Sequence, residues 1–328
     1  MDSLPPTFCL DVMGNLDLKW EKYGELAKAL TGRWHAAARS FTENIHELQL
    51  LCKVYNGKWS YIAAFRERRD DRSDEEILAM NDRYIRCHFI YINTSSEGIE
   101  YYNSCPKEEI LNEVIPRVIP QLRPSSRIFF QHNICALSRK DADLFYHSLL
   151  DSSGFGIRCF GALALTYYGP ESLYFLAILL TRGCNFEGLL LASGWPHSTA
   201  MEDLIVKFMC PRPRITFYIH SPEGAESQPT LKLTPRIMQA IVNAWDKADS
   251  YLYVCTPRYT GLEEVLSVPV PPNVNRRLLK AKYKNKYFII WSKDSGSTLS
   301  CTLNYAEHKI SFNSPANERV YDRNNMCL

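Results

Sequence analysis

Residues 198–219, STAMEDLIVKFMCPRPRITFYI, hold one complete structural unit of this chain. The opening serine can cap a helix, because its hydroxyl can accept a hydrogen bond from an unpaired backbone amide. Met201, Ile205 and Phe208 then recur at helical spacing, and a run rich in β-branched and aromatic residues follows from Ile215. The stretch therefore predicts a capped amphipathic helix, a short gap and a buried strand.

The same unit recurs about six times within residues 73–256. The first core-facing residue of each expected helix is Ile77, Leu111, Ala142, Leu173, Met201 or Ile237. The expected strands are 89–92, 128–130, 162–165, 189–191, 215–219 and 252–254. A period of this size is typical of stacked supersecondary units that cannot bury their apolar faces alone. We expect the strands to pair in parallel through right-handed crossovers.

Two arrangements of this sheet remain open. One face of the strand 215–219 is apolar and carries Ile215, Phe217 and Ile219. The other face carries Arg214, Thr216, Tyr218 and His220. This alternation favours a curved sheet with all helices on one side, as in leucine-rich repeats, whereas the wholly apolar strand 189–191 favours a sheet covered on both faces. The leucine-rich repeat signature itself is absent, so the comparison concerns geometry only.

Different sequences flank this array. Before it, residues 48–55 and 58–65 bracket Asn56-Gly57, the strongest short signal for a hairpin. After it, residues 278–291, 298–304 and 309–312 are typical of antiparallel strands that could cap the array. The chain therefore predicts an α/β fold in three parts: a helical segment at 1–45, a hairpin plus a curved parallel array at 46–258, and antiparallel strands at 259–328.

The composition excludes several classes of protein. The 328 residues are 46% hydrophobic and 23% charged with a net charge of +2, which argues against a dominant phosphate-binding surface. No apolar run approaches the ~20 residues that span a bilayer, and the first residues lack a signal-peptide pattern. The 11 cysteines form no Cys-x-x-Cys pair. They favour reduced thiols in a cytoplasmic or nuclear protein, without a metal site.

The N-terminal segment carries a recognisable pattern. Leu4-Pro5 opens it, and Phe8, Val12 and Leu16 follow at fourfold spacing on one face of a helix. A later helix holds Leu30 and Trp34, followed by small alanines. This pattern resembles the F-box, and the chain is similar in layout to the large nematode families of F-box-like proteins. Thr31 departs from the Cys or Ser that often precedes the tryptophan.

The resemblance implies a partner and a function. A Skp-type adaptor would take the apolar side chains into a groove, where desolvated anchors dominate the affinity. The expected adaptor-binding residues are Leu4, Pro5, Phe8, Val12, Leu16, Leu30 and Trp34. The chain would then recruit a protein target to a cullin-RING ubiquitin ligase and perform no bond chemistry. The alternative is a repeat binding protein with no ligase link, whose N-terminal helices only cap the array.

The target would bind the array. In a curved sheet the strand residues opposite the helices line a concave surface, which repeat proteins commonly use for binding. Tyrosine and arginine are enriched among the residues that dominate interfaces. The expected target-binding residues are Arg214, Thr216, Tyr218, His220, Tyr251 and Tyr253.

Signs of catalysis or nucleic-acid binding are weak. Trp195-Pro196-His197-Ser198 lies at a strand-to-helix turn, where α/β enzymes often act, but Ser198 is explained as a helix cap. No nucleophile elbow, phosphate loop or metal-ligand spacing occurs, so we expect no catalytic residue, cofactor or metal. The basic residues 276–287 could bind nucleic acid, yet their alternation favours an edge strand whose lysines prevent edge-to-edge pairing.

Overall fold

The computed structural model describes residues 4–16, 18, 20–66, 73–94, 103–130, 137–153, 155, 160–192, 194–210, 214–219, 231–248, 251–257, 261–280, 286–306 and 309–314. The chain divides into two compact units, Met1–Phe186 and Glu187–Leu328. Each unit combines helices with a mixed sheet, so the predicted α/β class is confirmed. The division falls inside the range 46–258 that was expected to form the array.

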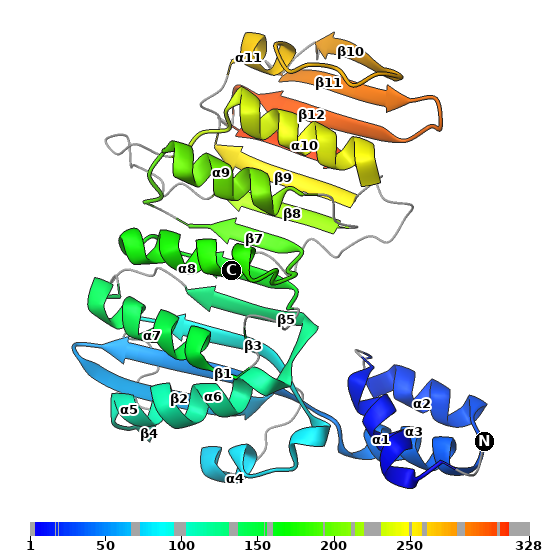
Figure 1. Cartoon of the computed structure of the whole chain (residues 1–328), viewed down its shortest axis with the longest axis vertical. Helices are drawn as coiled ribbons and strands as arrows, with labels where there is room; N and C mark the ends of the chain where they lie inside the picture. The colour runs from blue at the N-terminus through cyan, green and yellow to red at the C-terminus, as the bar shows by residue number, and fades with distance from the viewer. Residues whose placement is uncertain are drawn as a thin grey trace. The chain divides into compact units, whose positions relative to one another are not determined.

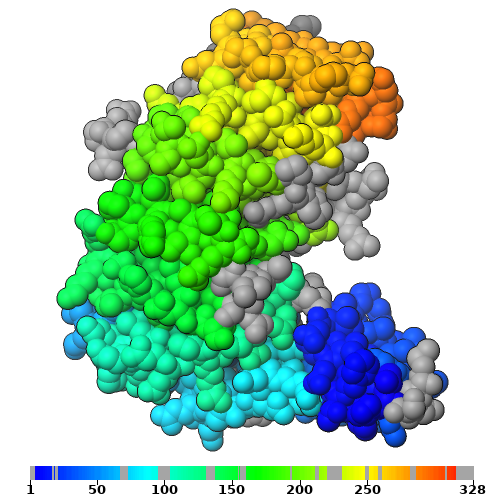
Figure 2. Space-filling view, viewed as in Figure 1, coloured from blue at the N-terminus to red at the C-terminus, as the bar shows by residue number. Residues whose placement is uncertain are grey.

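The first unit begins with helices. These are α1 (Pro6–Asn15), α2 (Trp20–Ala29) and α3 (Gly32–Asn44), and residues 4–44 are called the N-terminal helical segment below. In the space-filling view this segment forms a compact block, drawn in blue (Figure 2). Its core consists of Cys9, Met13, Tyr23, Ala27, Ala37, Ala38 and Phe41.

A hairpin follows the helices. Its strands are β1 (His46–Tyr55) and β2 (Lys58–Phe65), which pair antiparallel with Tyr55 opposite Lys58. Asn56 and Gly57 have φ angles of 50° and 74°, as a two-residue turn with two left-handed positions requires. The hairpin predicted from Asn56-Gly57 is therefore confirmed.

The sheet of the first unit is mixed: the strands expected in the array pair in parallel as predicted, and the antiparallel hairpin belongs to the same sheet. Its order is β4-β2-β1-β3-β5-β6, with β4 at Asn103–Ser104, β3 at Ile85–Asn93, β5 at Leu122–Phe130 and β6 at Ala162–Leu165. Strand β1 pairs in parallel with β3, and β3, β5 and β6 continue in parallel. The hairpin therefore joins the same sheet and brings the antiparallel strand β2 with it. Helices α4 (Asp74–Leu78), α7 (Arg139–Asp151) and α8 (Pro170–Thr181) lie between the strands in sequence (Figure 1).

A helix with two prolines precedes β5 and contains a π turn. It runs through α5 (Lys107–Glu109), a π segment (Ile110–Val114), α6 (Ile115–Val118) and a 3₁₀ turn (Ile119–Gln121). Its buried residues come in pairs every four positions: Ile110, Leu111, Val114, Ile115, Val118 and Ile119. In a regular α-helix, residues four positions apart point in directions about 40° apart around the helix axis, so a row of such pairs would gradually rotate away from the core. The π turn contains more residues per turn and reduces this rotation.

The π turn also changes the hydrogen bonds near Pro116. The Ile115 amide donates to the Ile110 carbonyl rather than to that of Leu111. The Leu111 carbonyl instead accepts the Ser148 hydroxyl of α7 at 2.5 Å. The helix thus bypasses the missing N–H of proline by changing its turn, and a neighbouring helix satisfies the freed acceptor.

Aromatic side chains fill much of the core of the first unit. Trp59 of β2 stacks on Phe145 of α7 with ring centroids 4.9 Å apart. Tyr146, the next residue of α7, stacks on Phe175 of α8 at 4.5 Å. Both contacts lie in the range at which aromatic pairs add stability beyond the burial of their area. They fix α7 between the hairpin and α8.

The second unit has the order β10-β11-β12-β13-β9-β8-β7. Its strands are β7 (Gly188–Leu191), β8 (Arg214–Ile219), β9 (Tyr251–Pro257), β10 (Val274–Lys280), β11 (Lys286–Lys293), β12 (Thr298–Asn304) and β13 (Lys309–Ser314). Its helices are α9 (Thr199–Phe208), α10 (Pro235–Ala248) and α11 (Leu262–Leu266).

Strands β7, β8 and β9 pair in parallel, and the C-terminal strands pair antiparallel. Strand β13 pairs with β9, so the antiparallel strands expected to cap the array continue its sheet. The stretch 278–291, expected as one strand, belongs to β10 and β11, and residues 281–285 between them lie outside the described part.

Serine side chains cap helices α4, α7 and α9, and the cap predicted at Ser198 is among them. Ser73 and Glu76 form a capping box at α4, with the Glu76 amide 3.2 Å from the Ser73 hydroxyl. Ser138 accepts from the Asp141 amide at the start of α7. Ser198 accepts from the Met201 amide at 3.2 Å at the start of α9. Within the described residues, no helix has the length and apolar character needed to cross a membrane.

Candidate partner-binding surfaces

Helix α1 has a buried face and an exposed apolar residue. Cys9 and Met13 point into the core of the helical segment and are almost fully buried. Phe8 lies on another side of the helix and is 46% exposed. Leu4 and Val12 are half-buried, and Pro5 is exposed. The core of the segment is therefore closed without burying Phe8, which remains available to a partner.

Phe8 is held against the start of α3. Its ring meets that of Trp34 edge-to-face, with centroids 6.2 Å apart. The Arg33 guanidinium donates a hydrogen bond to the Leu4 carbonyl and ties the two helices together at the same place. The buried Trp34 indole N–H has no hydrogen-bond partner among the described residues. The structure thus gathers Leu4, Phe8 and Trp34, three residues of the expected adaptor site.

Leu16, which was expected on the same helix face as Phe8, lies one residue beyond the end of that helix. Helix α1 ends at Asn15, and Leu16 follows it with an extended backbone at φ −76° and ψ 130°. The buried Tyr23 hydroxyl lies 2.7 Å from the Leu16 carbonyl and holds this turn. Leu16 and Leu30 are half-buried and pack on the core of the segment.

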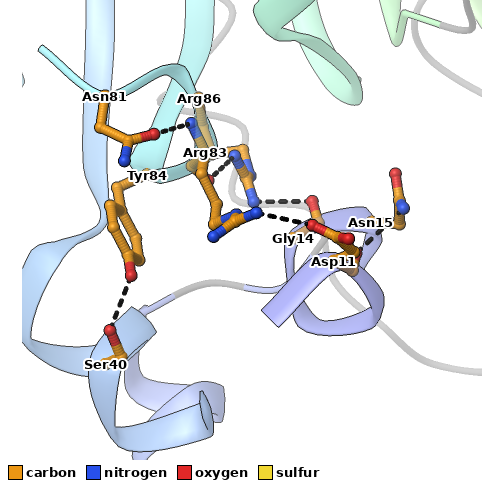
Figure 3. A network of polar contacts seen from close by, with 8 residues as sticks. All are labelled: Asp11, Gly14, Asn15, Ser40, Asn81, Arg83, Tyr84 and Arg86. Carbon is orange, nitrogen blue, oxygen red and sulfur yellow. Dashed lines mark hydrogen bonds and ion pairs between the residues drawn. The ribbon is translucent and has the colours of Figure 1, made fainter. Parts of the chain in front are cut away.

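A buried arginine joins the helical segment to the sheet (Figure 3). Arg86, the second residue of β3, is only 7% exposed. Its guanidinium donates to the Gly14 carbonyl of α1 at 2.7 Å and to the Arg83 and Ile85 carbonyls at 2.8 Å. The same group lies 5.5 Å from the centre of the Phe41 ring of α3. One side chain therefore contacts two of the three helices.

Further contacts from the 3₁₀ turn Asp82–Tyr84 surround this arginine. Arg83 forms an ion pair with Asp11 at 2.9 Å, and the Tyr84 and Ser40 hydroxyls lie 2.8 Å apart (Figure 3). The Tyr84 ring packs on Phe41 with centroids 5.0 Å apart. We call Asp11, Gly14, Ser40, Arg83, Tyr84 and Arg86 the junction. It holds the helical segment at a fixed place on the start of β3.

Helices α9 and α10 lie on one side of β8 and β9 (Figure 1). Ile215, Phe217 and Ile219 of β8 are buried, and the Phe217 ring packs on Phe208 of α9 with centroids 6.2 Å apart. Opposite them, Arg214 is exposed, and Thr216, Tyr218, Tyr251 and Tyr253 are half-buried. His220 lies outside the described residues. In this part of the second unit, the alternation read from the sequence therefore separates a buried face from an accessible one.

The strand register brings these residues together. Arg214 lies opposite Tyr251, and Thr216 lies opposite Tyr253. The Tyr218 and Tyr253 rings are 5.3 Å apart, and a hydrogen bond joins their side chains. Burial, reinforced by Tyr253, raises the pKa of the Tyr218 hydroxyl above its ordinary value. The surface thus offers aromatic area, neutral hydroxyls and one arginine, which suits contacts with a polypeptide.

Ser198 lies in the turn before α9 and caps that helix. Its hydroxyl is engaged as the helix cap, and the neighbouring His197 lies 3.7 Å from the Glu202 carboxylate. Arg236 of α10 also approaches Glu202, at 3.9 Å, and Asp203, at 2.5 Å. These charges link two helices. Among the described residues, no group of histidine, cysteine and acidic side chains is placed to hold a metal ion.

Sequence reasoning missed the junction. Arg86 sits in a strand and Arg83 in a charged turn, and both are 72 positions away from their partners Gly14 and Asp11. No local spacing signals such a contact. The other missed feature, two exposed leucines on β10, is visible in the sequence as Leu278-Leu279 within a basic stretch.

The chain matches no model of a known protein family, and it matches none of the curated proteins.

Proposed function

We propose that this protein is a substrate-recruiting subunit of a cullin-RING ubiquitin ligase. The N-terminal helical segment would bind a Skp-type adaptor, and the α/β sheet would bind the protein to be modified. In this role the chain has no catalytic residue and needs no cofactor or metal, and it would act in the cytoplasm or nucleus.

One observation carries the proposal. Phe8 is exposed while the core of its helical segment is closed, and it belongs to the Leu-Pro-led pattern that resembles an F-box. Exposed apolar side chains that lie together on a surface, rather than singly, are candidates for partner contacts. Leu4, Pro5 and Trp34 surround Phe8 in sequence or in space, which gives an apolar anchor with a fixed neighbour.

The test is binding of a purified Skp-type adaptor to the full chain. Phe8→Asp should reduce the affinity at least tenfold, because a carboxylate would have to enter an apolar groove. Tyr174→Asp is the matched control, since Tyr174 of α8 is a 63% exposed aromatic outside the helical segment. Circular dichroism should show both variants folded. Failure of the unaltered chain to bind the adaptor would exclude the ligase role.

The sheet surface of Arg214, Thr216, Tyr218, Tyr251 and Tyr253 is the proposed target site. Its support is accessibility together with a composition that is common in protein interfaces. The curved, leucine-rich-repeat-like geometry belongs to the same proposal, because a concave surface would surround the target on several sides.

A binding protein without a ligase link is the second candidate, and the junction favours it. Arg86 and Arg83 tie the helical segment to β3 as a terminal cap would be tied. Both candidates share the target surface, and they differ only in adaptor binding. The adaptor experiment therefore separates them.

A further inference from the structure

Strand β10 ends the sheet of the second unit (top of Figure 1). Its inner edge pairs with β11, with Arg277 opposite Ile290 and Leu279 opposite Phe288. Among the described residues, no strand pairs with its outer edge. An edge strand of this kind presents backbone donors and acceptors that can accept another strand.

The side chains on β10 are unusual for an exposed edge. Leu278 and Leu279 are adjacent, so they point to opposite faces of the sheet, and they are 45% and 53% exposed. On the face of Leu279, the half-buried Phe288 and Ile290 of β11 continue the apolar surface. Edge strands that are protected against pairing with other strands usually carry charged side chains, and Leu278 and Leu279 do not fit that pattern. The leucines point instead to an apolar occupant.

Charge decides what kind of occupant fits. Arg277 and Lys280 flank the two leucines and are exposed, and Val274–Lys280 contains no acidic residue. Arg276 is used within the chain, since it donates to the Val268 carbonyl at 2.8 Å. An incoming strand would therefore meet a cation, two leucines and a cation at four consecutive positions.

We propose that β10 binds an extended segment of another protein with the pattern acidic–apolar–apolar–acidic, which adds as a further strand. The two acidic residues lie opposite Arg277 and Lys280, and the apolar pair lies opposite Leu278 and Leu279. The pattern reads the same in both directions, so it applies to either strand polarity. Backbone hydrogen bonds supply general affinity, and the four side chains supply specificity.

Two other occupants fit less well. A second copy of β10 would bring the same basic strand against itself with no acidic residue to compensate. A nucleic acid would use aromatic stacking, but Tyr287 is half-buried, packs on Tyr305 at 5.6 Å and has the Lys280 ammonium over its ring. An acidic and apolar peptide uses the leucines, the charges and the free edge together.

The inference does not rest on adaptor binding, and its test is independent of it. Fluorescence anisotropy of the full chain would be measured with a fluorescein-labelled peptide SGEVIEGSK. A second peptide, SGVEEIGSK, has the same composition with acidic and apolar positions exchanged. The chain should bind the first peptide at least tenfold more tightly than the second.

Charge reversal on β10 makes the test specific. Arg277→Glu with Lys280→Glu should lose at least tenfold in affinity for SGEVIEGSK and gain affinity for SGKVIKGSE, because the ion pairs are restored with opposite signs. The control reverses two exposed cations elsewhere, Arg117→Glu with Lys140→Glu, and should bind as the unaltered chain does. Should the charge-reversed chain fail to fold, Leu278→Ser with Leu279→Ser tests the same site.

Three results would overturn the proposal. The first is equal binding of the two composition-matched peptides, or binding of neither. The second is tighter binding of a labelled oligouridine that the β10 reversal abolishes, which would assign the edge to nucleic acid. The third is a homodimer in sedimentation that the β10 reversal dissociates.

Discussion

The N-terminal helical segment borders the sheet of the first unit, and the strand β10 forms an edge of the sheet of the second unit. The two regions differ in how much apolar surface and backbone they leave exposed. The helical segment closes its own core and is fixed to β3 by the buried Arg86. Strand β10 leaves two leucines and a backbone edge exposed. The helical segment therefore exposes the aromatic ring of Phe8 on a helix, whereas β10 exposes two leucine side chains on a strand at the edge of a sheet.

Exposed apolar residues therefore lie on two kinds of secondary structure in this protein, a helix and an edge strand. Phe8 projects from a helix whose backbone hydrogen bonds are internal, so only side chains can mediate its contacts. Leu278 and Leu279 lie on a strand whose outer backbone groups can also bind. Measuring the free energy of unfolding of variants in each region can therefore show which side chains stabilise the fold and which do not.

The largest effect is expected inside the helical segment. Met13→Asp would place a charge at a position that is 3% exposed and has no cationic partner in the core cluster. We expect a loss of ~3–5 kcal/mol in the free energy of unfolding, as when a buried charge is left unpaired. Urea denaturation followed by circular dichroism measures it. A change below 1 kcal/mol would show that the core assigned to this segment is wrong.

Breaking the junction should have an intermediate effect. Arg86→Met keeps the apolar part of the side chain but removes the hydrogen bonds to the Gly14, Arg83 and Ile85 carbonyls, at a cost of about 2–3 kcal/mol. Arg83→Ala loses only the exposed pair with Asp11 and should cost less than about 1 kcal/mol. Limited proteolysis between the helices and β1 should accelerate in the first variant alone. Equal effects of the two changes would argue against a special role of Arg86.

The smallest effect is expected on β10. Leu278→Thr and Leu279→Thr should each change the free energy of unfolding by no more than about 0.5 kcal/mol, because both side chains are already half-exposed and threonine suits a strand. Urea denaturation again gives the value. A loss of unfolding free energy comparable to that of Arg86→Met would mean that the leucines stabilise the fold, and it would argue against their role in binding a partner.

The sequence predicted the features that depend on near neighbours. Ser198 caps its helix as expected, because a cap needs only an oxygen and an amide two or three residues later. Asn56-Gly57 makes its turn for the same local reason. The alternation of Arg214, Thr216 and Tyr218 with buried residues also holds, because the strand period is two.

Features that depend on distant partners were missed or misread. Leu16 was expected within the helix that carries Phe8, but that helix ends at Asn15 and the Tyr23 hydroxyl donates a hydrogen bond to the Leu16 carbonyl. The sheet is mixed because β1 pairs with β3 and β13 pairs with β9, and local patterns do not specify pairing partners. The candidate adaptor site was predicted in part, with Leu4, Phe8 and Trp34 together.

The placement of the tryptophans has a consequence for spectroscopy. Trp59 is buried against Phe145 in the first unit, whereas Trp291 is fully buried in β11 of the second unit, with its ring 6.1 Å from Phe312. Each indole therefore lies in an asymmetric aromatic environment that exists only while its own unit is folded. The chain has six tryptophans, so the signal of one unit is obtained by difference. The part of the near-ultraviolet signal that Trp59→Phe removes would report on the first unit, and the part that Trp291→Phe removes would report on the second.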